Sequence, residues 1–312
     1  MFAPITPSVL LALGGILAIL LVASLITAIL KRLHPDNSYV ELTQRIQSWW
    51  IIIGIFSGAM LLSRTASILF FAFVSFLALK EYFSLIPTRR ADRRVLFWAY
   101  AAIPFQYYWV HLEWYGMFII FIPVYLFLLL PMRMVMIGDT KDFLRAAGTL
   151  HWGLMTMVFS LSHAAFFLVL DETKNQAGGG AGLVLYLIFL TQFNDVAQYV
   201  WGKLTGRHKI IPKVSPNKTW EGFLGGLATT ATLAMVLAPH LTPLTTIESL
   251  AAGLLIALGG FIGDVTISAL KRDIGVKDSG SLLPGHGGIL DRIDSLTYTA
   301  PLLFHFVYYF HY

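Results

Sequence analysis

Long apolar stretches separated by short polar loops dominate the chain. Ten of them can be marked along the sequence, at residues 8–30, 48–63, 65–86, 95–112, 114–136, 149–170, 180–202, 221–239, 247–270 and 294–311. A helix needs about 20 residues to cross the hydrocarbon core of a bilayer, and most of these stretches approach that length. Within lipid the backbone groups must bond inside their own segment, which favours helices. The pattern therefore predicts an all-α, polytopic integral membrane protein with about ten transmembrane helices.

Composition favours a membrane protein over a soluble one. Of the 312 residues, 57% are hydrophobic and 12% are charged, and the mean hydropathy is +0.71. The charged share is about half that of an ordinary soluble domain, too small to cover the surface of a soluble fold of this size. The sequence contains no Cys, which excludes disulfides, zinc–thiolate sites and thiol nucleophiles.

The positive charges are unevenly distributed between the loops. The formal net charge is +5 and the pI is near 9.3, yet all but two of the 22 Lys and Arg residues fall in alternate loops. The two exceptions are Arg64 and Lys174. This asymmetry is the positive-inside pattern, so we expect a cell-membrane protein with its basic loops in the cytoplasm and both termini outside. Orientation and contact with anionic lipid headgroups account for the basic excess, and no nucleic-acid partner is predicted.

The two halves of the chain differ in chemistry. Before residue 190 polar groups are scattered, and aromatic pairs such as Trp114-Tyr115 fall at the ends of spans, as in a membrane-interface belt. We interpret residues 1–190 as a transmembrane scaffold and residues 191–312 as a catalytic region of the same membrane domain. The first apolar run has about 23 residues and no basic start, which favours a retained span over a cleavable signal peptide.

Two polar segments in the second half stand out from their apolar surroundings. Asp195 lies inside the seventh predicted span, where an Asp costs on the order of 2.5–3.5 kcal/mol near the bilayer centre and usually has a partner or a cavity. In the basic loop at 203–221, Ser215 and Thr219 can supply hydroxyl donors to phosphate oxygens, and Lys218 can supply a point charge. An Asp that snorkels to the headgroups and a plain positive-inside bias are the alternative interpretations of these segments.

A third segment, from 264 to 294, combines acidic, basic and glycine residues at a membrane boundary. On a helix Asp264, Ser268 and Lys271 fall at i, i+4 and i+7 and share one face. Further on, the glycines that flank His286 allow backbone N–H groups to approach an anionic ligand closely. An acid, a hydroxyl and an ammonium make a poor lipid-facing surface, and we expect them to bind a metal and a phosphate instead.

These residue types together indicate phosphate chemistry. Asp291 and Asp294 open the last predicted span, and Asp264 and Asp291 are the kind of carboxylates that hold Mg²⁺ while it bridges phosphate oxygens. Nearby Lys and Arg side chains can neutralise a phosphoryl group during an in-line displacement. The sequence has no P-loop, protein-kinase or HExxH motif. The residues therefore predict metal-assisted phosphoryl or nucleotidyl transfer at the cytoplasmic face, on a substrate held in the bilayer.

The same residues resemble the motifs of a known enzyme family. The chain contains the run Ser268-x-Leu270-Lys271-Arg272-x4-Lys277-Asp278-x-Gly280-x2-Leu283-Pro284-x-His286-Gly287-Gly288-Ile289-x-Asp291-Arg292-Ile293-Asp294, preceded by Ser215-Pro216-x-Lys218-Thr219-x-Glu221-Gly222 and Asp195-x3-Tyr199. This order of motifs resembles the phosphatidate cytidylyltransferases, also called CDP-diglyceride synthetases. The motifs cover about residues 192–294, and the run at 268–294 is very specific. The first half of the chain is similar to the family only as a variable set of spans.

The resemblance implies that CTP and phosphatidate react to give CDP-diacylglycerol and pyrophosphate in phospholipid biosynthesis, with Mg²⁺ as the cofactor. It implies that the lipid phosphate attacks the α-phosphorus of CTP. The implied catalytic residues are Asp264, Asp291, Lys271 and Arg292, and the two Asp residues would hold the metal. The implied substrate-binding residues are Asp195, Ser215, Lys218, Thr219, Ser268, Arg272, Lys277, His286 and Asp294. Of these, Asp195 and Asp294 would support the site, and His286 would shape the turn.

Two positions depart from the family pattern. Asn217 stands where a second Lys is common, and Gln198 stands where Ala is usual, so the identity of the lipid phosphate stays open. One alternative function is a CTP-dependent lipid kinase of the dolichol- or phytol-kinase kind, which would transfer the γ-phosphate to an alcohol. The other is an ion-coupled transporter, because buried acidic residues also mark ion pathways. The sequence leaves the oligomeric state open, a homodimer included.

Overall fold

The computed structural model describes residues 6–34, 38–87, 93–280 and 287–312. Over these ranges the structure is built from helices and connecting loops, with a single isolated antiparallel bridge between Lys209 and Thr219. The prediction of an all-α, polytopic protein is confirmed.

The helices follow the predicted spans closely. Those of the first half are α1 (Pro7–Leu33), α2 (Val40–Leu62), α3 (Arg64–Leu85), α4 (Arg93–His111), α5 (Tyr115–Ile120), η2 (Phe121–Leu126), α6 (Phe127–Val135), α7 (Phe143–Leu154), η3 (Met155–Phe159), α8 (Ser160–Phe166) and η4 (Phe167–Val169). Those of the second half are η5 (Glu172–Lys174), α9 (Gly179–Thr205), α10 (Trp220–Leu241), α11 (Thr246–Asp273), α12 (Leu290–Ile293) and α13 (Leu296–His311). The pieces from α5 to α6 form one rod, and so do those from α7 to η4, because short π-helical or 3₁₀ turns connect them without a break.

Within the described ranges, eight rods are long and apolar enough to cross a membrane. They account for eight of the ten predicted spans. The other two, 95–112 and 294–311, are helical but do not meet this criterion. Helix α13 has 16 residues, fewer than the roughly 20 that a bilayer core requires, and α4 begins with two Arg residues and carries polar Gln106. Eight of the ten predicted spans therefore qualify as membrane-crossing by length and apolarity, and the other two are helices of 19 and 16 residues.

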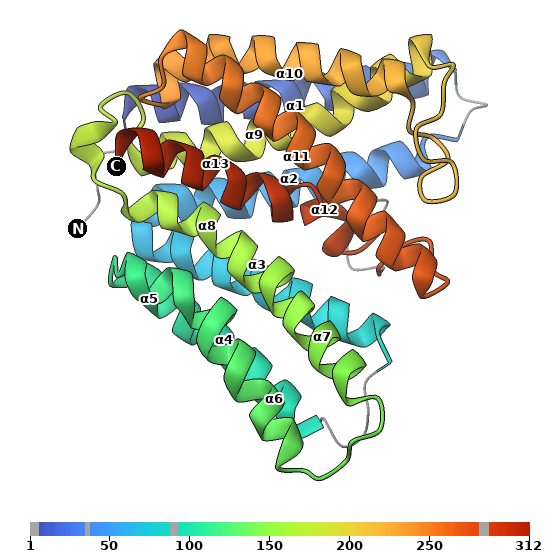
Figure 1. The fold of residues 1–312 in the computed structure, drawn as a ribbon. Helices are drawn as coiled ribbons and strands as arrows, with labels where there is room; N and C mark the ends of the chain where they lie inside the picture. Colours follow the sequence, from blue (N-terminus) through green and yellow to red (C-terminus); the bar gives the residue numbers. More distant parts are fainter. Residues whose placement is uncertain (1–5, 35–37, 88–92, 281–286) are drawn as a thin grey trace.

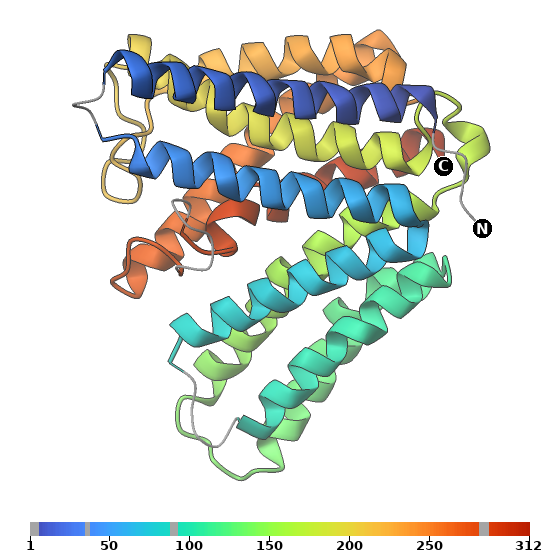
Figure 2. The same cartoon turned by 180° about the vertical axis from the view of Figure 1, so that it is seen from behind.

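The helices form two groups (Figures 1 and 2). Helices α1, α2, α9, α10, α11 and α13 lie in one bundle, and α3 to α8 form an arm that inclines away from it. Both termini and the loop at 171–178 lie at one end of the bundle. The loops at 206–219 and 274–280, together with α12, lie at the opposite end. We call the latter the site end, because it collects the polar segments of the second half.

Small residues let α9, α10 and α11 approach closely near the site end. A Cβ atom on Gly222 of α10 would lie 2.7 Å from the carbonyl oxygen of Gln198 on α9. A Cβ atom on Gly263 of α11 would lie 2.5 Å from the carbonyl oxygen of Asp294. Asn194 on α9 is fully buried and hydrogen-bonds to both α10 and α11. This packing fixes the three helices that carry the polar segments relative to one another.

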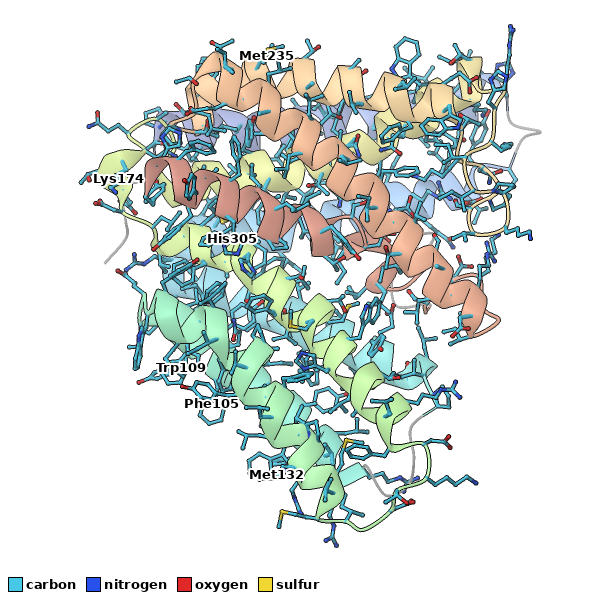
Figure 3. All side chains as sticks on the ribbon, in the orientation of Figure 1. Phe105, Trp109, Met132, Lys174, Met235 and His305 are labelled. Atoms are coloured by element: carbon cyan, nitrogen blue, oxygen red, sulfur yellow. The ribbon has the colours of Figure 1, made fainter. Side chains whose placement is uncertain are left out.

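The outer surface of the helices is apolar. Phe105 on α4 is 52% exposed and Met132 on α6 is 55% exposed, and both point outward in Figure 3. The same figure places Lys174 near the termini, where its Nζ donates a hydrogen bond to the Tyr312 carbonyl at 3.1 Å. An apolar surface of this kind is suited to contact with lipid chains.

Candidate functional site

The loop before α10 meets the middle of α11 through an ion pair. Lys218 Nζ lies 2.6 Å from Asp264 Oδ2, and the two side chains are 19% and 22% exposed. Lys218 Nζ also donates to Gln198 Oε1 at 3.1 Å, and Ser268 Oγ donates to Asp264 Oδ1 at 3.3 Å. Asp264 and Ser268 therefore share a face of α11, and the basic loop closes over that face.

Two further carboxylates lie beside this ion pair. Both carboxylate oxygens of Asp195 accept the Ser295 hydroxyl, at 3.1 and 3.0 Å, and Asp294 Oδ1 accepts the backbone N–H of Ser295 at 2.7 Å. Asp195 and Asp294 are close enough to each other and to Asp264 for their charges to repel. Together with two cations that attract them, these groups form what we call the carboxylate cluster: Asp195, Asp264, Asp294, Lys218 and Arg292. The cluster thus brings three acidic and two basic side chains together.

A second ion pair joins the end of α11 to α12. Lys271 Nζ lies 2.6 Å from Asp291 Oδ1, with side chains that are 14% and 8% exposed. Asp291 Oδ2 accepts the backbone N–H and the hydroxyl of Ser279, at 3.0 and 2.9 Å, and the N–H of Gly288 at 3.1 Å. A carboxylate offers roughly four acceptor positions, so Asp291 is fully engaged. Asp291 thereby connects Lys271 to the backbone at Ser279 and at Gly288.

Glu81, at the end of α3, makes a contact that the sequence analysis did not predict. Its two carboxylate oxygens accept the backbone N–H groups of Ile289, at 2.9 Å, and of Leu290, at 3.0 Å. A Cβ atom on Gly288 would collide with the same carboxylate. Glu81 thereby satisfies the N–H groups at the start of α12, which carries Asp291. Its signal in the sequence was the one used for Asp195, an acidic residue within a predicted span.

The loop at 206–219 is held in shape by its own polar groups. Thr219 is buried, and its Oγ1 accepts the backbone N–H of Gly222 at 3.2 Å, which makes it the N-cap of α10. Glu221 accepts the N–H groups of Arg207 and His208, at 3.0 and 3.2 Å. The Thr219 hydroxyl, predicted to donate to a phosphate, accepts the hydrogen bond that begins α10 in this structure.

The remaining predicted residues lie around these two ion pairs. Arg272 Nε donates to the Val214 carbonyl at 3.2 Å and so connects the end of α11 to the loop that carries Ser215. Ser215 is half-buried in that loop, and Lys277 is exposed. His286 lies outside the described residues.

The charged forms of Lys218, in the loop before α10, and of Asp291, on α12, are stabilised by their ion-pair partners. Burial acts to lower the pKa of Lys218, but the Asp264 and Asp195 carboxylates outweigh it and hold that pKa above its ordinary value. Burial acts to raise the pKa of Asp291, but the hydrogen bond and charge of Lys271, with the backbone N–H groups of Ser279 and Gly288, hold that pKa below its ordinary value. Lys218 and Asp291 are therefore charged near neutral pH.

The carboxylates can be tested for their fit to a divalent metal. The part of the chain that the structure describes contains no group of three or more Asp, Glu or His side chains arranged as a metal-binding set. Mg²⁺ commonly takes only one or two protein carboxylates and fills its shell with water and substrate phosphates. Asp264 fits that mode, because it is partly exposed and has further carboxylates beside it. Asp291 would bind the ion in place of its present ion pair with Lys271.

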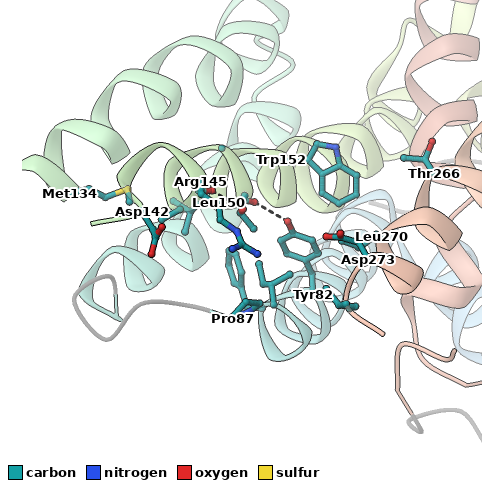
Figure 4. Close-up of a pocket in the computed structure, with 16 residues that line it drawn as sticks. Tyr82, Pro87, Met134, Asp142, Arg145, Leu150, Trp152, Thr266, Leu270 and Asp273 are labelled. Atoms are coloured by element: carbon teal, nitrogen blue, oxygen red, sulfur yellow. Dashed lines mark hydrogen bonds between the residues drawn. The ribbon is translucent and has the colours of Figure 1, made fainter. Parts of the chain in front are cut away.

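A cleft of about 590 Å³ lies between the arm and α11 (Figure 4). From the arm it is lined by residues such as Tyr82, whose hydroxyl donates to the Thr149 carbonyl at 2.9 Å. From α11 it is lined by Thr266, Leu270 and Asp273. These positions are rotated by about 200° from Asp264, Ser268 and Lys271, so they belong to the opposite face of α11. The cleft is therefore separate from the carboxylate cluster.

Comparison with known proteins agrees with this arrangement. A model of the cytidylyltransferase family matches residues 43–310. The chain is 48% identical over 298 residues to uncharacterized protein YnbB of Escherichia coli strain K12, which covers 96% of this chain and 98% of that protein. It is 40% identical over 158 residues to the phosphatidate cytidylyltransferase of Staphylococcus aureus strain COL, and 37% identical over 157 residues to that of Staphylococcus saprophyticus. Each of these two matches covers 49% of this chain and 59% of the relative.

The match of the family to more than four-fifths of the chain favours the enzyme over the ion-coupled transporter. It extends from the start of α2 to the end of α13 and so includes both ion pairs and Glu81. We conclude that this chain belongs to the cytidylyltransferase family and is a multi-pass membrane nucleotidyltransferase.

Proposed function

We propose that this protein transfers the cytidylyl group of CTP to phosphatidate or a closely related lipid phosphate. The products would be a CDP-lipid and pyrophosphate. The observation that carries the proposal is the meeting of three motif segments, distant in sequence, through the pairs Lys218–Asp264, Lys271–Asp291 and Ser295–Asp195. The relatives named phosphatidate cytidylyltransferase support the choice of substrate.

The reaction needs charge neutralisation more than proton transfer. A phosphate oxygen of the lipid attacks the α-phosphorus of CTP, a new P–O bond forms, and the bond to the bridging oxygen of the β-phosphate breaks to release pyrophosphate. A lipid phosphomonoester is already anionic, so little base catalysis is required. The ammonium groups of Lys218 and Lys271 can stabilise the charge that develops on the phosphoryl oxygens and the leaving group.

We propose Mg²⁺ as the cofactor, with Asp264 as a ligand and phosphate oxygens of CTP completing the shell. When bound, the ion would withdraw charge from the phosphates. Lys218, which lies beside Asp264, would contact a phosphate of the bound substrate. The partial exposure of Asp264 and the closeness of the Asp195 and Asp294 carboxylates support this assignment. We also propose Asp291 as a second ligand, with its partner Lys271 as a contact for substrate phosphate.

We propose that the site end lies in the cytoplasm. The loops at 206–219 and 274–280, together with α12, carry six Lys and Arg residues, whereas Arg64 and Lys174 lie toward the end with the termini. Loops rich in Lys and Arg are retained on the cytoplasmic side. The site would thereby draw CTP from the cytoplasm and lipid from the bilayer.

The proposal is tested with purified protein, phosphatidate and CTP labelled at either the α- or the γ-phosphorus. Cytidylyl transfer places the α-label in the lipid and the γ-label in pyrophosphate. A lipid kinase acting on an added polyprenol or phytol would place the γ-label in the lipid and leave the α-label in CDP. Absence of α-label from every lipid phosphate tried, in protein shown to be folded, would refute the proposal.

A further inference from the structure

An apolar cavity of about 320 Å³ lies between the bundle and helix α3 of the arm, apart from the cleft of Figure 4. Helices α1, α2, α3 and α9 form most of its wall, with α12 and the start of α13 closing it. Its lining is almost wholly aliphatic and aromatic, and includes Phe56, Leu77 and Ile188. Its volume is at the lower limit for ligand sites, which span roughly 300–1,000 Å³, so it can hold part of a ligand.

One charged residue stands in this apolar lining. Among the described residues that line the cavity, Arg292 carries the sole charge, and Gln192 beside it donates to the Arg292 carbonyl at 3.2 Å. Arg292 Nε is buried and has no hydrogen-bond partner within the described part of the chain. A buried donor without a partner is costly, and an arginine fork matches a phosphate group well. The arrangement suits a ligand with an anionic end.

The two ends of the cavity differ: one is charged and lies toward the site end, and the other is apolar. Arg292 lies on α12 at the site end and Gln192 lies at the middle of α9, whereas Leu13 lies early in α1, toward the termini. Arg292 also belongs to the carboxylate cluster, where it attracts Asp195 and Asp294. The charged end of the cavity therefore adjoins the carboxylate cluster, and its apolar part extends into the membrane-level interior.

The cavity also reaches the membrane-facing surface. Ile51, Ile55 and Phe73 line it and are nevertheless exposed, at 61%, 58% and 58%. They lie on α2 and α3, whose outward surfaces are apolar. A hydrocarbon chain can therefore pass between the bilayer and the cavity without crossing a polar barrier.

We propose that this cavity holds an acyl chain of the acceptor lipid while Arg292 binds its phosphomonoester. The inference rests on the proposed function and deepens it, because it assigns Arg292 to the lipid phosphate and leaves Lys218 and Lys271 to the nucleotide. A neutral diacylglycerol lacks the group that Arg292 would bind. A phospholipid with a larger headgroup would place that headgroup against Asp195 and Asp294.

The kinetic test narrows the cavity without touching the polar site. Leu77→Trp places a bulky ring in the lining, and Leu69→Trp, on the same helix, is the matched control because Leu69 is 63% exposed and does not line the cavity. For Leu77→Trp we expect the KM for dioleoyl phosphatidate to rise about tenfold, because the acyl chain loses contacts that it makes equally in the ground state and the transition state. The KM for CTP and the turnover of short-chain (dihexanoyl) phosphatidate should stay as in wild type. Equal effects of the two variants would overturn the inference.

A binding test does not depend on turnover. Phosphatidate with a photoreactive acyl chain, in vesicles containing the intact protein, should form adducts with cavity residues on α2, α3 or α9. Excess phosphatidate should displace it, whereas diacylglycerol and phosphatidylethanolamine should not. Adducts confined to the outer helix surfaces, or equal competition by all three lipids, would overturn the inference. If the wild type binds in this way but forms no CDP-lipid, the proposed reaction fails and the lipid-phosphate site remains.

Discussion

Replacement of Asp264 by Asn is the sharpest test of the carboxylate cluster. The substitution preserves the shape of the side chain and its capacity to accept a hydrogen bond from Ser268, but it removes the charge that lies 2.6 Å from Lys218 Nζ. Lys218 would keep its hydrogen bond to Gln198 and its weaker attraction to Asp195. The change therefore isolates one charge in an otherwise intact site.

The structure sets the expected size of two separate effects. Removing one partner of a fully buried ion pair destabilises a protein by about 3–5 kcal/mol, whereas exposed pairs contribute about 0–1 kcal/mol. The Lys218–Asp264 pair is about one-fifth exposed, and Lys218 retains other partners, so we expect a loss of about 1–3 kcal/mol in folding free energy. Loss of a charge that organises the reacting phosphates should reduce turnover about 10²–10³-fold.

A double-mutant cycle separates the two effects. Lys218→Met combined with Asp264→Asn removes both charges, so the double variant should unfold at a higher temperature than Asp264→Asn alone. Its turnover should be little worse than that of either single variant, because the two residues act as a unit. CDP-lipid formation at saturating Mg²⁺ and thermal unfolding in detergent are the measurements, with exposed Asp278→Asn as the mild control. Near-normal turnover in folded Asp264→Asn would refute the assignment of this carboxylate.

Four further predictions test the remaining contacts and the orientation in the membrane. Asp291→Asn should be folded but nearly inactive. Glu81→Gln should lower both turnover and stability because it loosens α12, and the exposed Glu41→Gln should change neither. CDP-lipid formation and thermal unfolding are the measurements for all three variants. The pKa of Lys218 is raised, so the charge of Lys218 and the stability it gives are fully present below the ordinary lysine pKa of about 10.4 and are lost only above it. Lys218→Arg should therefore show the same pH–rate profile as wild type up to about pH 9. Single Cys residues at Arg93, Lys213 and Lys277 should be labelled only from the cytoplasmic side and those at Thr173 and Thr245 only from outside, and labelling of Lys213 and Lys277 from opposite faces would break the proposed shared site.

The sequence predicted the helices well because one physical rule determines most of them. Every predicted span corresponds to a helix or helical rod in the structure, since a long apolar run in lipid has few alternatives to a helix. The helices α4 and α13 are shorter or more polar than the other eight spans, but they too lie where the apolar runs predicted them. Periodicity also placed Asp264 and Ser268 on one face of α11, because local helix geometry alone decides that relation.

The partners of the site residues could not be read from the sequence in the same way. The polar segments were predicted to meet, but whether Asp264 faces Lys218 or Lys271 depends on how α9, α10 and α11 pack. The contact between Glu81 and Ile289 joins positions 208 residues apart, and no local pattern encodes such a distance. Glu81 falls within residues 1–190, which were interpreted as scaffold because their polar groups are scattered along the chain.

The departures from the family pattern acquire a physical meaning at Lys218. Gln198, which stands where Ala is usual, accepts a hydrogen bond from the Lys218 ammonium, and an amide holds that group without cancelling its charge. Asn217, which stands where a second Lys is common, removes a positive charge next to it and is exposed. The loop therefore presents one oriented cation in place of two adjacent ones. Because a single positioned charge must then neutralise the phosphate that the loop faces, Lys218 should tolerate substitution less well here than in relatives with both lysines.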